Sequence, residues 1–178
     1  MLINRIEEYL VSNIREGKCA VTLGVFCRII DKQDKVLLRL RKEKSSIINK
    51  DLSCKYELIG GGLKIEDISE DYHHALVTRL EKEIRAEAGI NVTLDKIIWV
   101  AFLTTRKTLQ KGIIDLALMT DIDFTICEIT KIYEEMIDDK SLVWVDRNKI
   151  NVPIIGKRME EMIRYPRLKS DINYYSNI

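Results

Sequence analysis

Glu83 and Glu87 are the two residues of this chain whose type and spacing are best suited to chemistry. They are four residues apart, about one turn of an α-helix, so both carboxylates project from one helix face. Paired carboxylates on a rigid helix can hold a hard divalent cation. Gly60, Gly61 and Gly62 precede the helix, and a glycine-rich turn brings backbone close to a ligand. The pattern predicts a site for a metal-bound, phosphate-rich ligand.

The elements that position these residues are a strand, a glycine turn and a helix. Residues 56–59 are predicted as a short strand that runs directly into the three glycines. Ser69 is predicted as the helix N-cap, with Glu70 and Asp71 in the first turn, where the helix dipole favours acids. Gly89 is predicted to end the helix.

The rest of the chain alternates apolar strands with polar turns. Two strands, 20–30 and 36–41, are predicted to form a hairpin, and residues 42–55 are a polar excursion. The other predicted elements are a helix over 2–16, strands over 96–104, 113–121 and 141–145, an acidic helical or irregular stretch over 128–139, and a helix over 153–165. Hairpins around one long helix predict an α+β fold rather than regular βαβ winding.

Length, charge and cysteine content limit which classes of protein this chain can belong to. The chain has 178 residues, enough for one domain, with an N-terminal helix within 1–17 and a loosely ordered tail at 167–178. Its 29 basic and 28 acidic residues nearly cancel, which argues against binding of nucleic acid or an anionic membrane. The four cysteines have no metal-site spacing, and neither a signal peptide nor a membrane span is evident. These features predict a cytoplasmic, soluble protein with free thiols.

The helix and its glycines resemble the signature of the Nudix hydrolase family. That signature is Gly, five residues, Glu, seven residues, then Arg-Glu-apolar-x-Glu-Glu-x-Gly-apolar. Here the second half reads Lys82-Glu83-Ile84-Arg85-Ala86-Glu87-Ala88-Gly89-Ile90. Residues 36–41 are similar to the family's second strand, which often ends in an arginine, and 142–146 resemble its Trp-Val segment. The resemblance implies an α/β/α sandwich with a mixed β-sheet and one catalytic helix.

Four departures separate this chain from the signature. Lys82 replaces the arginine, Ala86 replaces one of the paired glutamates, and Ile59 stands where a proline often precedes the glycines. The fourth departure is an excess of seven residues, about two helical turns, before Lys82. The first acid of the signature corresponds to Asp67 if counted from Gly61, or to His74 if counted back from Lys82, and both alignments stay open.

The resemblance also implies roles for individual residues. Glu83 and Glu87 would bind Mg²⁺ or Mn²⁺ together with the Gly60 carbonyl, while Gly61 and Gly62 permit the close turn against the substrate. Arg41 would hold a phosphate. A downstream acid would act as ligand or general base, and Glu134 and Glu135 are the candidates, with Glu128 as another.

Other polar and aromatic residues are predicted to serve the fold. Arg79 precedes Glu83 by one turn and is predicted to form a surface ion pair with it, and Arg39 is predicted to be a half-exposed strand residue. His73 and His74 are predicted to be solvated or half-buried. The aromatic residues predicted to lie in the core or at the rim of the sheet are Trp99, Phe102 and Trp144.

The implied activity is divalent-metal-dependent hydrolysis of a phosphoanhydride in nucleoside diphosphate-linked compounds or nucleoside triphosphates. The partner would be a small-molecule nucleotide. Ala86 and Lys82 favour an alternative, a catalytically degenerate Nudix-type domain that binds a nucleotide or regulates a partner. A partner-binding scaffold without a ligand is a third possibility, and a homodimer through the N-terminal helix or the sheet edge is compatible with the sequence.

Overall fold

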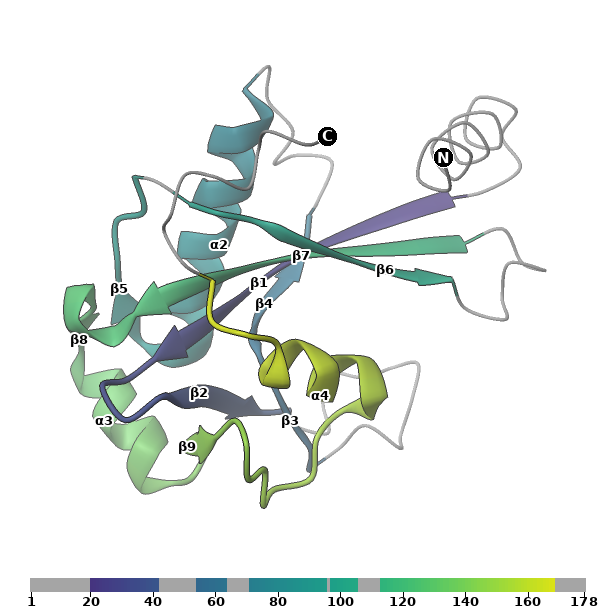
Figure 1. Cartoon of the computed structure of the whole chain (residues 1–178). Helices are drawn as coiled ribbons and strands as arrows, with labels where there is room; N and C mark the ends of the chain where they lie inside the picture. Colours follow the sequence, from purple (N-terminus) through teal and green to yellow (C-terminus); the bar gives the residue numbers. More distant parts are fainter. Residues whose placement is uncertain (1–19, 42–53, 64–70, 96, 106–112, 169–178) are drawn as a thin grey trace.

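A computed structural model describes residues 20–41, 54–63, 71–95, 97–105 and 113–168. The predicted N-terminal helix, most of the polar excursion, Asp67, Ser69, Glu70 and the tail from 169 onward lie outside these residues. The described part is an α/β/α sandwich built on a mixed sheet, so the predicted α+β class is confirmed (Figure 1). The strands are β1 (Ala20–Ile30), β2 (Lys35–Leu40), β3 (Tyr56–Glu57), β4 (Ile59–Gly62), β5 (Ile90–Asn91), β6 (Val100–Thr105), β7 (Ile113–Asp123), β8 (Glu128–Ile129) and β9 (Leu142–Asp146). The helices are α2 (Tyr72–Ala88), η5 (Phe124–Ile126), α3 (Lys131–Asp138) and α4 (Gly156–Arg164).

The main sheet is organised around β1. Its order is β3-β2-β1-β7-β6, with β4 also pairing with β1 and β9 with β2. β1 and β2 form the predicted antiparallel hairpin. β1 and β7 pair in parallel along their whole length, from Ala20 opposite Ile113 to Ile30 opposite Asp123. The glycine strand β4 pairs antiparallel with the middle of β1, from Gly24 opposite Gly62 to Cys27 opposite Ile59.

Two apolar cores lie on opposite faces of the sheet because side chains alternate along each strand. Val25, Cys27 and Ile29 of β1 point into the core under α2 and α3. Phe26 and Ile30 point toward α4. Figure 1 shows the α2 and α4 ribbons on these two sides of the sheet.

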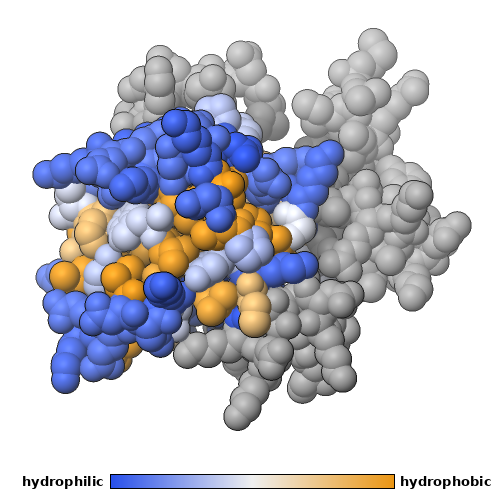
Figure 2. All heavy atoms as spheres, turned by 90° about the horizontal axis from the view of Figure 1, so that it is seen from below, coloured by the Kyte–Doolittle hydropathy of each residue, from blue (hydrophilic) through white to orange (hydrophobic). Residues whose placement is uncertain are grey.

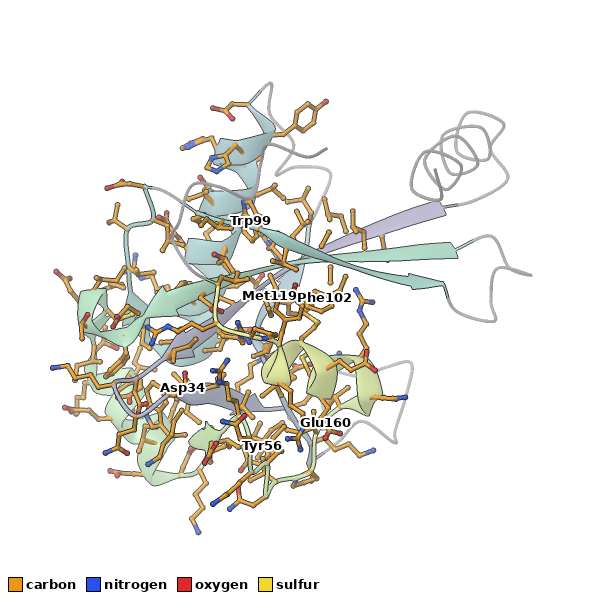
Figure 3. All side chains as sticks on the ribbon, in the orientation of Figure 1. Asp34, Tyr56, Trp99, Phe102, Met119 and Glu160 are labelled. Atoms are coloured by element: carbon orange, nitrogen blue, oxygen red, sulfur yellow. The ribbon has the colours of Figure 1, made fainter. Side chains whose placement is uncertain are left out.

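The aromatic residues of the sheet pack against these cores, as predicted. Trp99 and Trp144 contact the α2 core, and Phe102 contacts the α4 core. Phe102 and Met119 project from neighbouring strands toward α4 (Figure 3). Phe102 also meets Tyr165 edge to face at 5.2 Å. Seen from the side of α3 and β9, hydrophobic patches are bordered by hydrophilic residues (Figure 2).

Helix α2 begins later than predicted. Asp71, and not Ser69, is its N-cap: the Asp71 carboxylate accepts a hydrogen bond from the His74 N–H at 3.0 Å. Aspartate and serine are both good N-caps, so the sequence alone could not choose between them. The C-terminal prediction is confirmed, because Gly89 has φ +61° and its N–H donates to the Arg85 carbonyl.

The three glycines form a strand instead of the predicted turn. Gly60, Gly61 and Gly62 belong to β4 and pair with Phe26, Val25 and Gly24 of β1. A Cβ on Gly60 would lie 2.1 Å from the Val25 carbonyl oxygen, and its φ is +151°. Only glycine fits such close strand packing. The break at Leu58 divides the predicted strand 56–59 into β3 and β4.

The boundaries of three further elements shift. β6 begins at Val100 rather than at 96, and β9 runs from Leu142 to Asp146. Helix α4 begins at Gly156, three residues after the predicted start. The Pro153 carbonyl accepts a hydrogen bond from the Tyr56 N–H, and Ile155 donates to Tyr56, so this segment extends beside β3. The stretch 128–139 contains β8 followed by α3.

A buried arginine fastens the end of α4 to the sheet. Arg28 of β1 is fully buried and makes a bidentate ion pair with Asp121 of β7, at 2.7 and 2.8 Å. Its guanidinium also donates to carbonyls at the end of α4 and beyond it: Met162, Ile163, Tyr165 and Pro166. The Leu168 N–H donates to Asp121. We call this set of contacts the Arg28 clasp.

None of the described helices has the length and apolar character needed to span a membrane. Cys27, Cys54 and Cys127 are free thiols, as predicted, and Cys19 lies outside the described residues.

Candidate active site

Glu83 and Glu87 of α2 lie against the glycine strand. The Gly60 N–H donates a hydrogen bond to Glu87 Oε2 at 3.0 Å. A Cβ on Gly61 would lie 2.9 Å from Glu83 Oε1, whereas a Cβ on Gly62 would meet nothing within 4 Å. The carboxylates therefore sit directly beside the β4 backbone, and their close approach depends on Gly61 having no side chain.

Glu57 is part of this site, although the sequence did not single it out. It is 5% exposed and lies on β3 directly opposite Arg39 of β2. Arg39 Nη2 is 2.6 Å from Glu57 Oε1, and Arg41 Nη1 is 3.2 Å from Glu57 Oε2. Arginines two residues apart on a strand share a face, and that spacing was the available signal. Glu57 lies on another strand, and no sequence spacing relates it to the two arginines.

Arg39 joins the strands to the helix. Its Nη2 atom is also 2.9 Å from Glu87 Oε1. The prediction that Arg39 is only a half-exposed strand residue is therefore incomplete, since its side chain is 24% exposed but bridges two acids of the site. Charge-assisted contacts of this kind orient both partners.

The ion pair between Arg79 and Glu83 is confirmed, but it is not at the surface. The Arg79 side chain is 14% exposed and the Glu83 side chain is 15% exposed. Lys82 and Ala86, the two departures from the family pattern, are exposed. Arg79 rather than Lys82 therefore balances the charge of Glu83. We call the following six residues the arginine–glutamate cluster: Arg39, Arg41, Glu57, Arg79, Glu83 and Glu87.

Burial raises the pKa of Glu87 to about 7. Removal from water disfavours the ionised carboxylate, and the charges of Glu83 and Glu57 act in the same direction. The guanidinium of Arg39 and the Gly60 N–H oppose the shift without cancelling it. Near neutral pH, Glu87 is therefore poised between its protonated and ionised forms.

This shift predicts how stability depends on pH. A carboxyl whose pKa rises from 4.5 in the unfolded chain to about 7 in the folded protein stabilises the fold below pH 4.5. That stability is lost as the pH rises through 7. Wild type should lose stability relative to Glu87→Gln between pH 4.5 and 8, because glutamine does not titrate. The difference between the two free energies of unfolding should change on the order of 2 kcal/mol in favour of the variant. Urea unfolding of both proteins across this range measures it, and a constant difference contradicts it.

The downstream acids lie elsewhere on the molecule. Glu134 and Glu135 are exposed on α3, and Glu135 pairs with Lys131 of its own helix at 3.7 Å. Glu128 is exposed on β8, opposite Asn91. Among the described residues, none of these three acids contacts Glu83 or Glu87. His73 and His74 are exposed in the first turn of α2, and Asp67 is outside the described residues.

The arginine–glutamate cluster has the donor chemistry of a site for Mg²⁺ or Mn²⁺. Carboxylate oxygens and backbone groups are the ligands that such hard cations take. Within the described part of the chain, however, no three acidic, histidine or cysteine side chains already converge on one point as metal ligands do. The carboxylates are held by arginines instead. The residues present fit a cation through Glu83 and Glu87, provided that the arginine contacts rearrange.

Comparison with known proteins supports the fold. No family model matches the sequence, and no curated protein matches it either. The solution structure of the E. coli ORF135 protein is 17% identical, with a TM-score of 0.51, over 83% of this chain and 89% of that one. A MutT NUDIX hydrolase from Burkholderia pseudomallei is 13% identical, with a TM-score of 0.48, over 82% and 97%. A mutT/nudix family protein from Listeria innocua is 14% identical, with a TM-score of 0.46, over 81% and 88%. At 17% identity the likeness to the ORF135 protein concerns the fold alone. The resemblance of this chain to the Nudix hydrolase family rests on the order of its motif.

Proposed function

We propose that this chain is a divalent-metal-dependent hydrolase of a phosphoanhydride in a nucleoside diphosphate-linked compound or a nucleoside triphosphate. The observation that carries this proposal is the placement of Glu83 and Glu87 against the backbone of β4. Two carboxylates, a close-packed glycine backbone and three arginines meet there. That combination suits a ligand that brings both a cation and phosphate groups.

The residues of the arginine–glutamate cluster have different proposed roles. Glu83 and Glu87 hold the cation, with the Gly60 carbonyl as a further ligand. Mg²⁺ or Mn²⁺, when bound, neutralises charge on the phosphate oxygens and lowers the pKa of a bound water. Arg41 binds a phosphate through its planar guanidinium. Glu134, Glu135 and Glu128 remain the proposed sources of an assisting acid.

The test is an assay for nucleoside monophosphate, phosphate and pyrophosphate release across a nucleotide panel. It is run with Mg²⁺, with Mn²⁺ and with a chelator. Release that requires the cation supports the proposal. The absence of release from the whole panel with either metal, in protein that is folded by circular dichroism, rejects hydrolysis of these substrates.

The alternative is a catalytically degenerate domain that binds a nucleotide for regulation. It is favoured by the exposed Ala86 and by the arginines, which already neutralise the acids of the site. Calorimetry with nucleotides separates the two functions. Tight binding that needs no metal and leads to no turnover identifies the regulatory domain.

Gly61→Ala should lower the rate of metal-dependent hydrolysis by at least tenfold. The new methyl group would lie 2.9 Å from the Glu83 carboxylate and displace it from the β4 backbone. Gly62→Ala is the matched control, because a Cβ there meets nothing within 4 Å. Rates of both variants in the nucleotide assay measure the effect. Equal rates for the two variants would mean that the position of Glu83 is unimportant.

A further inference from the structure

Arg39 occupies the position between the acids of the site where a cation would otherwise be expected. One atom, Nη2, lies 2.6 Å from Glu57 Oε1 and 2.9 Å from Glu87 Oε1. Arg39 and Glu57 are held face to face by the β2–β3 ladder. The contact with Glu57 is thus fixed by the sheet, while the contact with Glu87 crosses to the helix.

Both oxygens of Glu87 are engaged. Oε2 accepts the Gly60 N–H at 3.0 Å, and Oε1 forms the ion pair with Arg39 Nη2 at 2.9 Å. A divalent cation that takes Oε1 brings a second positive charge next to the guanidinium. Coulomb repulsion between the two cations favours release of the guanidinium from Glu87, because both charges would lie beside a carboxylate that is only 13% exposed. Since Glu57 remains attached to Arg39, the displaced guanidinium stays within the site.

The guanidinium has hydrogen-bonding capacity left for an anion. Arginine carries five N–H donors. The Nε atoms of Arg39 and Arg41 are buried and have no hydrogen-bond partner among the described residues. Buried donors without acceptors are unfavourable, so an oxygen-rich anion that reached them would be bound firmly.

We propose that Arg39 is an internal counter-ion of Glu87 that a divalent cation releases, and that the released guanidinium then binds the phosphate of the substrate. This role rests on the proposed metal-dependent function. Arg39 holds the site closed to a cation when no nucleotide is present. Cation and phosphate enter together, because the phosphate takes up the arginine that the cation displaces. Free cation and nucleotide should therefore each bind more weakly alone than with the other.

Arg41 provides a matched control within the same cluster. It shares Glu57 with Arg39, at 3.2 Å, but it has no contact with Glu87 among the described residues. Its side chain is 29% exposed, close to the 24% of Arg39. Loss of either arginine removes one positive charge from Glu57, and only loss of Arg39 frees Glu87.

The experiment is a calorimetric titration of full-length protein with Mn²⁺ in the absence of nucleotide, at pH 8, where protonation of Glu87 competes less. Arg39→Gln should bind Mn²⁺ at least tenfold more tightly than wild type. The Mn²⁺ affinity of Arg41→Gln should stay within about threefold of that of wild type. Arg41 contacts Glu57 and not Glu87 among the described residues, so its charge acts on the cation from farther away. In the nucleotide assay, Arg39→Gln should raise KM at least tenfold, because a phosphate ligand is lost.

The outcomes separate this inference from the proposed function. If wild type binds Mn²⁺ and Arg39→Gln binds it no more tightly, the counter-ion role of Arg39 is wrong and the metal-dependent function stands. If neither protein binds Mn²⁺, with or without nucleotide, both are wrong. Equal tightening by Arg39→Gln and Arg41→Gln would show a general charge effect and would also reject the specific role of Arg39. Arg39→Met keeps the packing of the stem and replaces Arg39→Gln if the latter does not fold.

Discussion

Replacement of Glu83 and Glu87 together by glutamine should reduce kcat for nucleotide hydrolysis on the order of 10³-fold. Glutamine keeps the size of each side chain, but it lacks the charge that holds a divalent cation. Loss of the cation removes both the stabilisation of charge on the phosphate and the activation of water. The measurement is kcat and KM for the best nucleotide of the panel, with saturating Mg²⁺, for wild type, both single variants and the double variant.

The control for this loss is Glu161→Gln. Glu161 is an exposed residue of α4 whose ion pair with Lys157 spans 4.0 Å, so its replacement should leave kcat unchanged. Glu134→Gln and Glu135→Gln belong in the same series, because a large loss in either would identify the assisting acid. Equal activity of the double variant and wild type would reject Glu83 and Glu87 as the metal-binding pair.

Arg28→Met should destabilise the protein by about 3 to 5 kcal/mol, the usual effect of removing one partner of a buried ion pair. Asp121, whose side chain is 10% exposed, would keep a charge with no guanidinium beside it. The carbonyls at the end of α4 would lose their donor as well. Urea unfolding at pH 7 measures the change, and a loss below 1 kcal/mol would show that the Arg28 clasp contributes little.

A double variant divides this loss into two parts. Arg28→Met with Asp121→Leu leaves no buried charge, so the part of the loss that comes from the orphaned carboxylate should be restored. The part that comes from the α4 carbonyls should remain. Lys157→Met, which removes an exposed cation from the same helix, is the control and should not change the unfolding midpoint.

The fold could be predicted from the sequence largely where local patterns decide it. The hairpin of β1 and β2 and the end of α2 at Gly89 follow from alternation and from glycine at a left-handed position. The parallel pairing of β1 with β7 could not be predicted, because no local pattern identifies a strand's partner far along the chain. The glycine strand β4 was mistaken for a turn, since three glycines signal a turn unless a neighbouring strand is known.

The charged residues of the candidate site could also be predicted only where local spacing relates them. Glu83 and Glu87 share a helix face, and their spacing alone placed them together. Arg39 and Glu57 reach the site only because β2 and β3 pair in one particular register. That register is a property of the folded sheet. Arg41 was predicted to bind phosphate while Arg39 was not, yet the structure connects Arg39 to Glu87.

The long pairing of β1 with β7 has a consequence for how the chain folds as it is synthesised. Arg28 and Asp121, which face each other across these strands, are separated by 93 residues. The residues of the arginine–glutamate cluster all lie between them, within 39–87. The cluster therefore leaves the ribosome before the strand that completes the centre of the sheet. Until β7 emerges, one edge of the eleven-residue, largely apolar strand β1 has no partner, and an unpaired strand edge of this kind makes a nascent chain prone to aggregate.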